Sequence, residues 1–144
     1  MNTFDWRDEW AVGVPSMDRT HHEFVDCVNA MLQADDAGMS AALQAFIQHA
    51  KEHFAEENRA MQTSAYVSAG CHVDEHAAVL RSAGEVQAAL EHGNCHIVRA
   101  FAQALAEWFP EHARVMDLGL ARWLVQARLG GAPVVVRRRA ADPL

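Results

Sequence analysis

The chain has 144 residues, with 12 lysines and arginines against 19 aspartates and glutamates, which leaves a formal net charge of −7. This length is typical of a single domain that buries a full hydrophobic core without disulfide staples. The net negative charge argues against nucleic acid as a partner, because binding to phosphates needs clustered lysine and arginine.

Neither a secretory leader nor a membrane span is expected. Asp5, Arg7 and Asp8 lie where a signal peptide is apolar, and no run approaches the roughly 18 apolar residues of a transmembrane helix. The three cysteines are an odd number without a C-x-x-C pair, which excludes a complete disulfide framework and a zinc ribbon. We therefore expect a protein of a reducing compartment, the cytoplasm.

The first predicted element is an irregular arm over residues 1–15, which is rich in aromatic side chains. The remaining chain has few prolines and glycines and favours helices. Ser16 or Asp18 is expected to cap the first helix, and Ser40 to cap the second. Asn94 is expected to cap the fourth helix. The predicted helices cover residues 16–36, 40–63, 72–91 and 94–130.

Four helices joined by short loops predict an all-α fold, an up-down-up-down four-helix bundle preceded by the N-terminal arm. Pro110 lies inside the fourth helix, where its missing N–H predicts a kink near residues 106–110. One domain over residues 1–130 is expected, followed by a flexible C-terminal tail over 131–144. The basic run 137–139 falls in that tail and is interpreted as solvated surface.

Nine histidines form the most informative pattern. His53 and Glu57 are four residues apart, as are His72 and His76, so each pair lies on one face of its helix. A single histidine on a helix is more often a surface or core residue than a ligand. Here all four predicted helices carry a metal-type ligand, which favours a metal site in the bundle core. The other candidate ligands lie on the first and fourth helices: His21, His112 and Asp117.

The seven candidate ligands are imidazoles and carboxylates, which suit zinc, copper, iron and nickel, with the carboxylates adding a preference for harder ions. Seven donors exceed what one ion accepts, whereas two ions bridged by two carboxylates would use them all. The chain lacks E-x-x-H, which counts against ferritin-like di-iron bundles. It also lacks the H-E-x-x-H of metalloproteases.

In these blocks the sequence resembles the bacterial single-domain hemerythrins of the HHE cation-binding group. The resemblance covers about residues 4–120, in the family's order. The matching residues are the arm segments 4–6 and 12–14, Met17-Asp18-Arg19-Thr20-His21, His53-Phe54-Ala55-Glu56-Glu57 with Met61, His72-Val73-Asp74-Glu75-His76, and Trp108, His112 and Asp117.

The resemblance implies a non-haem centre of two iron ions that binds O2 reversibly. Its six-coordinate iron would be held by His72, His76 and His112. Its other iron, which keeps an open position for O2, would be held by His21 and His53. Glu57 and Asp117 would bridge the two, beside an oxo or hydroxo bridge.

Three ligand choices depend on neighbouring candidates. The family pattern places the ligand three residues after an aspartate, so Asp18 selects His21 rather than His22. The four-residue interval to His53 selects Glu57 over Glu56. Asp117 is five residues after His112, which on an ideal α-helix turns the two about 140° apart. Only the resemblance selects Asp117; a local distortion after Pro110 would help.

The chain departs from the family at two positions that line the small-ligand pocket. Ala113 stands where the family usually has a bulky aliphatic residue, and Phe109 where it often has leucine. We expect this exchange to alter O2 release or autoxidation. Phe24 and Phe54 are expected to complete an apolar pocket, and Trp108 to pack against the metal site and exclude water.

Three histidines remain outside this set. His49 is interpreted as a polar position toward the bundle end, with a supporting role near His53 as the alternative. A second metal site is a less favoured alternative at the turn between the third and fourth helices, formed by His92, Cys95 and His96.

Three functions fit the sequence. The first is an O2-binding protein for storage, transport or sensing, with no organic substrate. The second is a redox enzyme on the same scaffold, an oxidase, a peroxidase or a nitric-oxide-handling protein. The third is a regulatory module that reports iron or O2 to a partner. An apolar pocket favours reversible binding over proton-coupled chemistry.

Overall fold

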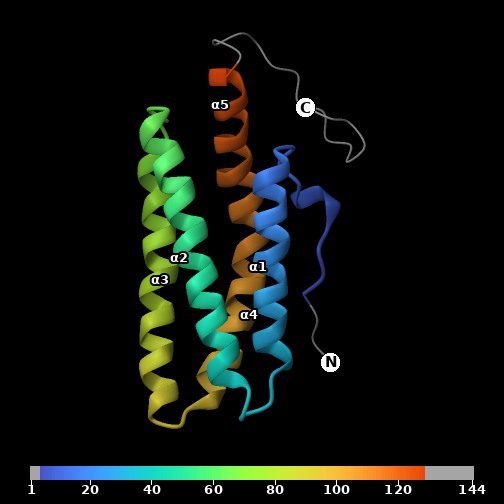
Figure 1. The fold of residues 1–144 in the computed structure, drawn as a ribbon, viewed down its shortest axis with the longest axis vertical. Helices are drawn as coiled ribbons and strands as arrows, with labels where there is room; N and C mark the ends of the chain where they lie inside the picture. The colour runs from blue at the N-terminus through green and yellow to red at the C-terminus, as the bar shows by residue number, and fades with distance from the viewer. Residues whose placement is uncertain (1–3, 129–144) are drawn as a thin grey trace.

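The computed structural model describes residues 4–128. The expectations for the C-terminal tail and its basic run therefore lie outside the described residues. Helices account for most of the described chain (Figure 1). The elements are a short 3-10 turn η1 (Asp8–Trp10), α1 (Pro15–Gln33), α2 (Met39–Thr63), α3 (Ala69–Glu91), α4 (Cys95–Glu111), the π-helical turn η2 (His112–Asp117) and α5 (Leu118–Arg128).

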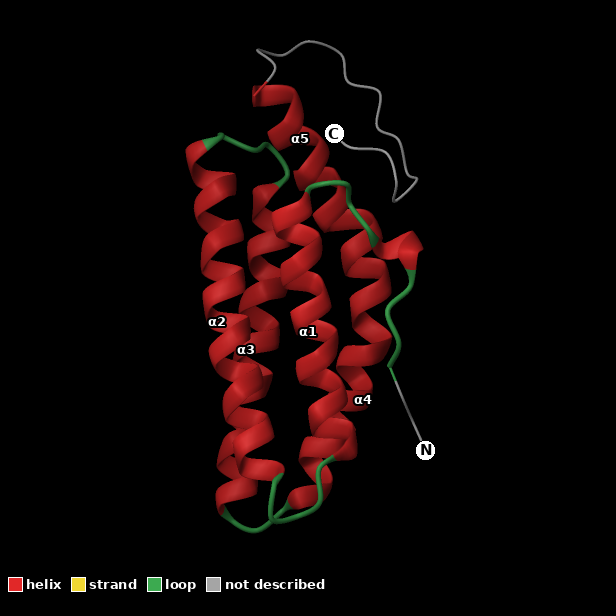
Figure 2. Ribbon diagram, turned by 45° about the vertical axis from the view of Figure 1, so that its right-hand side comes forward, coloured by secondary structure: helices red, strands yellow, loops and turns green. Residues whose placement is uncertain are grey.

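The helices form the predicted all-α, up-down-up-down four-helix bundle. Helix α1 packs against α2 and α4, and α3 packs against the same two helices from the other side. The turn η2 and α5 continue α4 along one axis, and α5 projects beyond the other helices (Figures 1 and 2). No helix within residues 4–128 has both the length and the apolarity needed to cross a bilayer.

The helix starts match the sequence predictions in part. Asn94 caps α4 as predicted, since its side-chain oxygen accepts from the N–H of Ile97 at 3.2 Å. Neither Ser16 nor Asp18 caps α1, because that helix begins one residue earlier, at Pro15. Proline suits this first position, where its missing N–H has no partner to lose and its φ is already helical.

The second and third helices also begin before their predicted starts. Helix α2 begins at Met39 without a side-chain cap, so Ser40 lies inside it. Helix α3 begins at Ala69, three residues before the predicted start at His72. The first helix ends at Gln33 instead of near residue 36. These are shifts of one to three residues, and element boundaries are the part of a fold that sequence patterns predict least well.

The fourth helix departs from regular α-helical geometry after Pro110 and not at that residue. Helix α4 continues through Pro110 to Glu111, and the regular pattern then changes in η2. There the N–H of Leu118 donates to the carbonyl of Ala113, five residues back. This is the hydrogen bond of a π-helix. The departure from α-helical hydrogen bonding thus falls at His112–Asp117, just after the segment 106–110 where a kink was predicted.

The hydrophobic core falls into two parts along the bundle axis. The larger cluster includes Phe24, Phe46 and Phe101 and extends toward the α1–α2 loop. The smaller cluster includes Met17 and Met61 and lies at the α5 end. On each of the four helices, the candidate ligands stand between residues of the larger and the smaller cluster. The bundle therefore places a polar layer between two apolar ones.

The N-terminal arm is fixed to the bundle by both its backbone and its aromatic rings. The Asp18 carboxylate accepts from the N–H groups of Val12 at 2.8 Å and Gly13 at 3.2 Å. The rings of Phe4 and Trp10 pack edge-on against Phe109 of α4, with centroids 6.0 and 5.4 Å apart. The arm thus follows the edge where α1 and α4 meet (Figure 2).

The loop between α2 and α3 docks on α5. The indole N–H of Trp123 donates to the Ser64 carbonyl at 3.2 Å, and the ring of Tyr66 packs on Trp123. At Gly119 a Cβ would lie 2.8 Å from the Tyr66 hydroxyl, so glycine permits this close approach. The register of α5 is therefore tied to this loop.

Candidate metal centre

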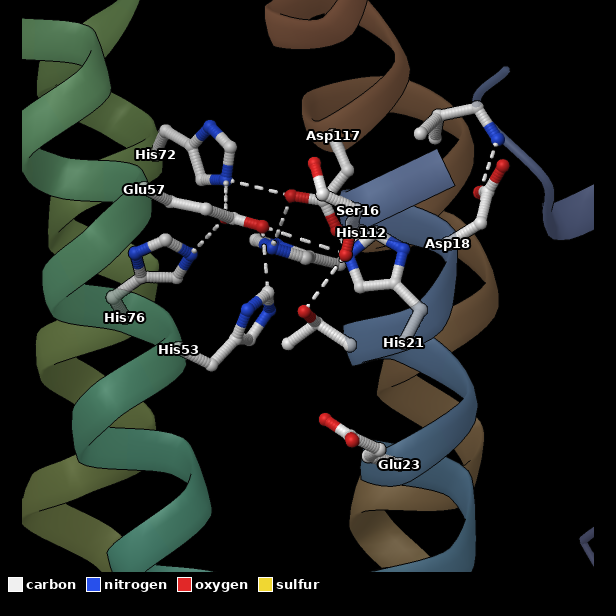
Figure 3. Close-up of polar contacts among 12 residues, drawn as sticks. Ser16, Asp18, His21, Glu23, His53, Glu57, His72, His76, His112 and Asp117 are labelled. Carbon is white, nitrogen blue, oxygen red and sulfur yellow. Dashed lines mark hydrogen bonds and ion pairs between the residues drawn. The ribbon is translucent and has the colours of Figure 1, made fainter. Parts of the chain in front are cut away.

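All seven predicted ligands come together in one buried cluster, with contributions from α1, α2, α3 and η2 (Figure 3). His53 and Glu57 are the most exposed of them, at 5% each. His21 and Asp117 have no exposed surface. The cluster consists of His21, His53, Glu57, His72, His76, His112 and Asp117.

Regular helix geometry explains two of the contributions. His53 and Glu57 lie one turn apart on α2, and their side chains are 3.2 Å apart. His72 and His76 lie one turn apart on α3, with ring centroids 4.5 Å apart. Four residues complete slightly more than one α-helical turn, so both members of each pair point into the bundle.

The π-helical turn explains the contribution that spacing alone did not predict. Five residues separate His112 from Asp117, and a π-helix closes its turn over five residues. The two side chains therefore point to the same side, with His112 Nε2 3.2 Å from Asp117 Oδ1. On an α-helix, two side chains five residues apart would point in different directions. The π-helical turn makes them adjacent ligands.

The Glu57 carboxylate divides its two oxygens between two groups of histidines. Its Oε1 lies 3.3 Å from Nε2 of both His72 and His76. Its Oε2 lies 3.2 Å from His53 Nε2 and 3.5 Å from His21 Nε2. One carboxylate thus faces two sets of nitrogen donors at once.

Asp117 divides its oxygens in the same way. Its Oδ1 lies 2.9 Å from His72 Nε2 and 3.2 Å from His112 Nε2. Its Oδ2 lies 3.1 Å from His21 Nε2. The cluster therefore has a three-histidine side, formed by His72, His76 and His112, and a two-histidine side, formed by His21 and His53. The two carboxylates span both sides.

Many polar atoms of the cluster are buried without a hydrogen bond to any described residue. They include both oxygens of Glu57 and the Nε2 atoms of His21, His76 and His112. Leaving such atoms unsatisfied in a protein interior is costly. They converge on the same small volume and are the donor types that bind transition metals. The residues present therefore fit a site for metal ions.

One histidine on each side is held in its charged form. Burial opposes the charge on His21, but contacts with Asp117 and Glu57 outweigh it and raise the pKa of His21 to about 10. The same balance, burial against contacts with Asp117 and Glu57, raises the pKa of His72 to about 9. Each side of the cluster thus holds one imidazolium against the two carboxylates.

The other titratable groups complete this charge pattern. Burial lowers the pKa of His53 to about 4, against the pull of Glu57. Burial also lowers the pKa of His76. Burial acts to raise the pKa of Glu57, but contacts with histidines hold that pKa well below its ordinary value. Metal ions need neutral imidazoles, so binding them displaces the protons held on the cluster.

Two residues behind the three-histidine side hold its rings in place. The Nδ1 of His112 lies 2.8 Å from the Glu75 carboxylate, which also accepts from the indole N–H of Trp108 at 3.2 Å. The Nδ1 of His76 lies 2.8 Å from the side-chain oxygen of Asn58. Such partners leave Nε2 free for a metal and fix the ring orientation. Sequence reasoning did not identify Glu75 or Asn58 in this role.

Aromatic rings surround the cluster. Trp108 lies nearly parallel to His112, with centroids 4.2 Å apart, in keeping with its expected position against the metal site. Phe54 stacks on His76 at 4.0 Å, and Phe109 lies edge-on to His21 at 5.5 Å. Ala113 is fully buried. Apolar side chains therefore pack against the cluster, while the expected small-ligand pocket at these positions stays a prediction.

The candidates that sequence analysis set aside lie outside the cluster. His22 is exposed and stacks on Trp6 of the arm, with centroids 3.8 Å apart. Glu56 is exposed. His49 stacks on His53 and lies 3.4 Å from Glu23, which gives it a supporting position. Within residues 4–128, every group of three or more adjacent metal-type ligands belongs to this one cluster, so the turn between α3 and α4 contains no second one.

Comparison with known proteins gives the same assignment. Residues 12–124 match the model of the hemerythrin HHE cation binding domain. The chain is 35% identical, over 126 residues, to a bacteriohemerythrin from Ralstonia nicotianae, an alignment that covers 88% of this chain and 92% of that protein. All seven clustered residues lie inside the matched range. The chain belongs to the hemerythrin family of HHE cation-binding domains.

Proposed function

We propose that the cluster holds two iron ions and that the protein binds O2 reversibly at them, for oxygen storage, transport or sensing. One ion is assigned to the three-histidine side and the other to the two-histidine side. Glu57 and Asp117 are assigned as bridging ligands. The histidine ligands proposed are His72, His76 and His112 for the first ion, and His21 and His53 for the second.

The observation that carries this proposal is the unequal division of histidines around two carboxylates. Each carboxylate directs one oxygen to each side. Since both sides share the same bridging groups, the two-histidine side has one protein ligand fewer. A metal site with a missing protein ligand is a site where an exogenous ligand binds. Iron held by these residues would supply the electrons for binding O2 there.

The surroundings favour binding over turnover of an organic substrate. The rings of Phe54 and Phe109 cover His76 and His21, respectively, with apolar surface. In the cavity between α1 and α2 that His53 and Glu57 line, the other charged side chains are Arg19 and Glu56, and both are exposed. The similarity to a bacteriohemerythrin from Ralstonia nicotianae fits this choice. The three cysteines are unpaired, which supports the assignment to the cytoplasm.

The test is visible absorption of the purified protein together with an iron assay. The reduced protein is exposed to O2 and then returned to anaerobic conditions. We expect two irons per chain and a coloured adduct that disappears when O2 is removed. Two irons that pass directly to the oxidised form, without a reversible adduct, would instead support the redox enzyme. A chain that retains no iron would overturn the proposal.

A further inference from the structure

A cavity of about 400 Å³ lies between the start of α1 and the end of α2 and borders the cluster. Two of the seven ligands, His53 and Glu57, form part of its lining. They also have the largest exposed fractions of the seven, at 5% each. Both side chains project from α2 toward α1 (Figure 3). This α1–α2 cavity therefore opens on a carboxylate and a histidine of the cluster.

The other polar groups in the lining include oxygen atoms that a cation could contact. Glu56 is exposed and precedes the ligand Glu57 on α2. The Thr20 hydroxyl donates its proton to the Ser16 carbonyl at 2.9 Å, so the lone pairs of its oxygen remain available. Arg19, also exposed, adds a positive charge to the lining. The two carboxylates and this one guanidinium leave an excess of negative charge along the cavity.

Two other cavities border the three-histidine side, and neither is lined by a carboxylate of the cluster. One of about 420 Å³ is lined by His72, which is only 1% exposed, and by no charged side chain. The other, of about 160 Å³, is lined by His112 with Glu75 and the exposed Glu111. There the Glu75 carboxylate already contacts His112 Nδ1 and accepts from Trp108. That cavity therefore reaches the outer side of a histidine ring.

The chemistry of a divalent cation favours the α1–α2 cavity. An ion that leaves water for a protein interior needs negative charge or polar ligands in exchange, because burial of an uncompensated charge is costly. This cavity offers the Glu56 carboxylate at the surface and the Glu57 carboxylate at its inner end. The oxygens of Glu57 face four histidine Nε2 atoms, on both sides of the cluster. An ion that reaches Glu57 is thus already among its ligands.

We infer that divalent metal ions enter the cluster through the α1–α2 cavity, attracted by Glu56 and received by His53 and Glu57. The inference rests on the assignment of the cluster as a metal site and does not depend on O2 binding. Glu56 has here a role different from that of a ligand, since it sets how fast ions arrive. Arg19 acts against it and slows the same step.

The first test changes the charge of the cavity. Stopped-flow mixing of the metal-free protein with Co²⁺ follows the visible absorption that develops as protein ligands replace water. We expect Glu56→Gln to slow loading by about three- to tenfold at low ionic strength and Arg19→Gln to accelerate it. Both effects are expected to shrink as salt is added. The matched control is Glu111→Gln, an exposed carboxylate in the cavity beside His112, which is expected to load at the wild-type rate.

The second test narrows the cavity without changing its charge. Ala60 lines the cavity from α2, so Ala60→Leu places a larger side chain in the route. The control is Gly70→Leu, in the cavity beside His72, where a Cβ meets nothing within 4 Å. We expect Ala60→Leu to slow both Co²⁺ association and its release to a chelator by about tenfold, a modest rise in a barrier. Because both rates change together, Kd is expected to stay close to that of the wild type.

The outcomes separate the route from the proposed function. Wild-type loading in Ala60→Leu, or equal slowing in Gly70→Leu, would overturn the route. Wild-type loading in Glu56→Gln, or equal slowing in Glu111→Gln, would overturn the role of Glu56. A protein that loads Co²⁺ through this cavity, but whose iron form gives no reversible O2 adduct, would contradict the proposed function and leave the route standing.

Discussion

On both sides of the metal centre, histidine Nε2 atoms face the same two carboxylates. The two sides differ in the residues that contact the outer nitrogens, Nδ1, of these histidines. On the three-histidine side, Glu75 and Asn58 hold the outer nitrogens of His112 and His76. On the two-histidine side, the outer nitrogen of His21 has no hydrogen bond, and an aromatic ring covers it. Polar contacts thus fix two of the three histidines on one side, His72 Nδ1 having no hydrogen bond, whereas His21 on the other side is held by packing.

This difference corresponds to the two tasks of the proposed centre. A histidine whose outer nitrogen is hydrogen bonded keeps its ring orientation and binds metal more tightly. The side with one protein ligand fewer keeps a position at which a ligand could arrive and leave. The electrostatics are nevertheless matched, because each side has one histidine with a raised pKa and one with a lowered pKa.

The largest expected effect on metal binding comes from removing a carboxylate that both sides share. In Glu57→Ala, both sides lose a ligand, because Glu57 faces four histidines through its two oxygens. We expect the protein to lose both ions, measured as iron per chain after purification. Glu52→Ala, at an exposed position on the same helix, is the control and is expected to keep both. Two irons retained in Glu57→Ala would show that Glu57 is not a bridge.

The matched electrostatics predict how the stability of the metal-free protein depends on pH. The pKa values of His21 and His72 are raised from 6.5 to about 10 and about 9, so their stabilisation is complete below pH 6.5 and is lost as pH rises through 9 to 10. The pKa of His53 is lowered to about 4, so stability is also lost as pH falls from 6.5 toward 4. Urea midpoints are therefore expected to be highest near pH 6.5. A midpoint that rises steadily from pH 6.5 to about 9 would contradict this charge pattern.

Removing one outer partner is expected to weaken the fixed side alone. In Glu75→Ala, the ring of His112 loses its hydrogen bond, and metal affinity is expected to fall by about 10- to 100-fold. Glu75→Gln keeps an acceptor oxygen and is expected to recover part of that loss. Competition with a chelator measures both, with the exposed neighbour Asp74→Ala as control. If Glu75→Ala lost no metal affinity, the contact between Glu75 and His112 would not contribute to metal binding on the three-histidine side.

The smallest effect concerns packing behind the two-histidine side. Ala113 is fully buried in the same hydrophobic cluster as Phe109, so Ala113→Ile is expected to cost about 1–3 kcal/mol of unfolding free energy by overpacking. Combined with Phe109→Leu, which frees volume, the loss is expected to be smaller than the sum of the two single effects. Chemical denaturation of the four proteins gives the comparison. Strictly additive costs would mean that the two positions do not share space.

The sequence was most informative where regular helix geometry governs the site. The pairs His53–Glu57 and His72–His76 follow from an interval of four residues, and the structure places each pair on one face of its helix. Short loops and few helix-breaking residues were sufficient to predict the bundle. In these places local periodicity and tertiary packing favour the same arrangement.

Features that depend on other parts of the chain were less predictable. Asp18 was expected to cap a helix but binds the arm, because its helix already begins at Pro15. The role of Glu75 appears only when α3 lies beside α4 and brings His112 within 2.8 Å. Asp117 required the resemblance to a family, since the π-helical turn that aligns it has no simple periodic signal.

That turn also has a consequence for the far end of the molecule. A π-helical turn contains one more residue than an α-helical turn, so it rotates everything after it by about 100°. The orientation of α5 therefore depends on the rotation that η2 introduces. The hydrogen bond from Trp123 to Ser64 depends on it too. Deleting one residue there would turn α5 away from its loop as well as separate two ligands. One inserted residue thus sets both the coordination of the metal and the docking of the last helix.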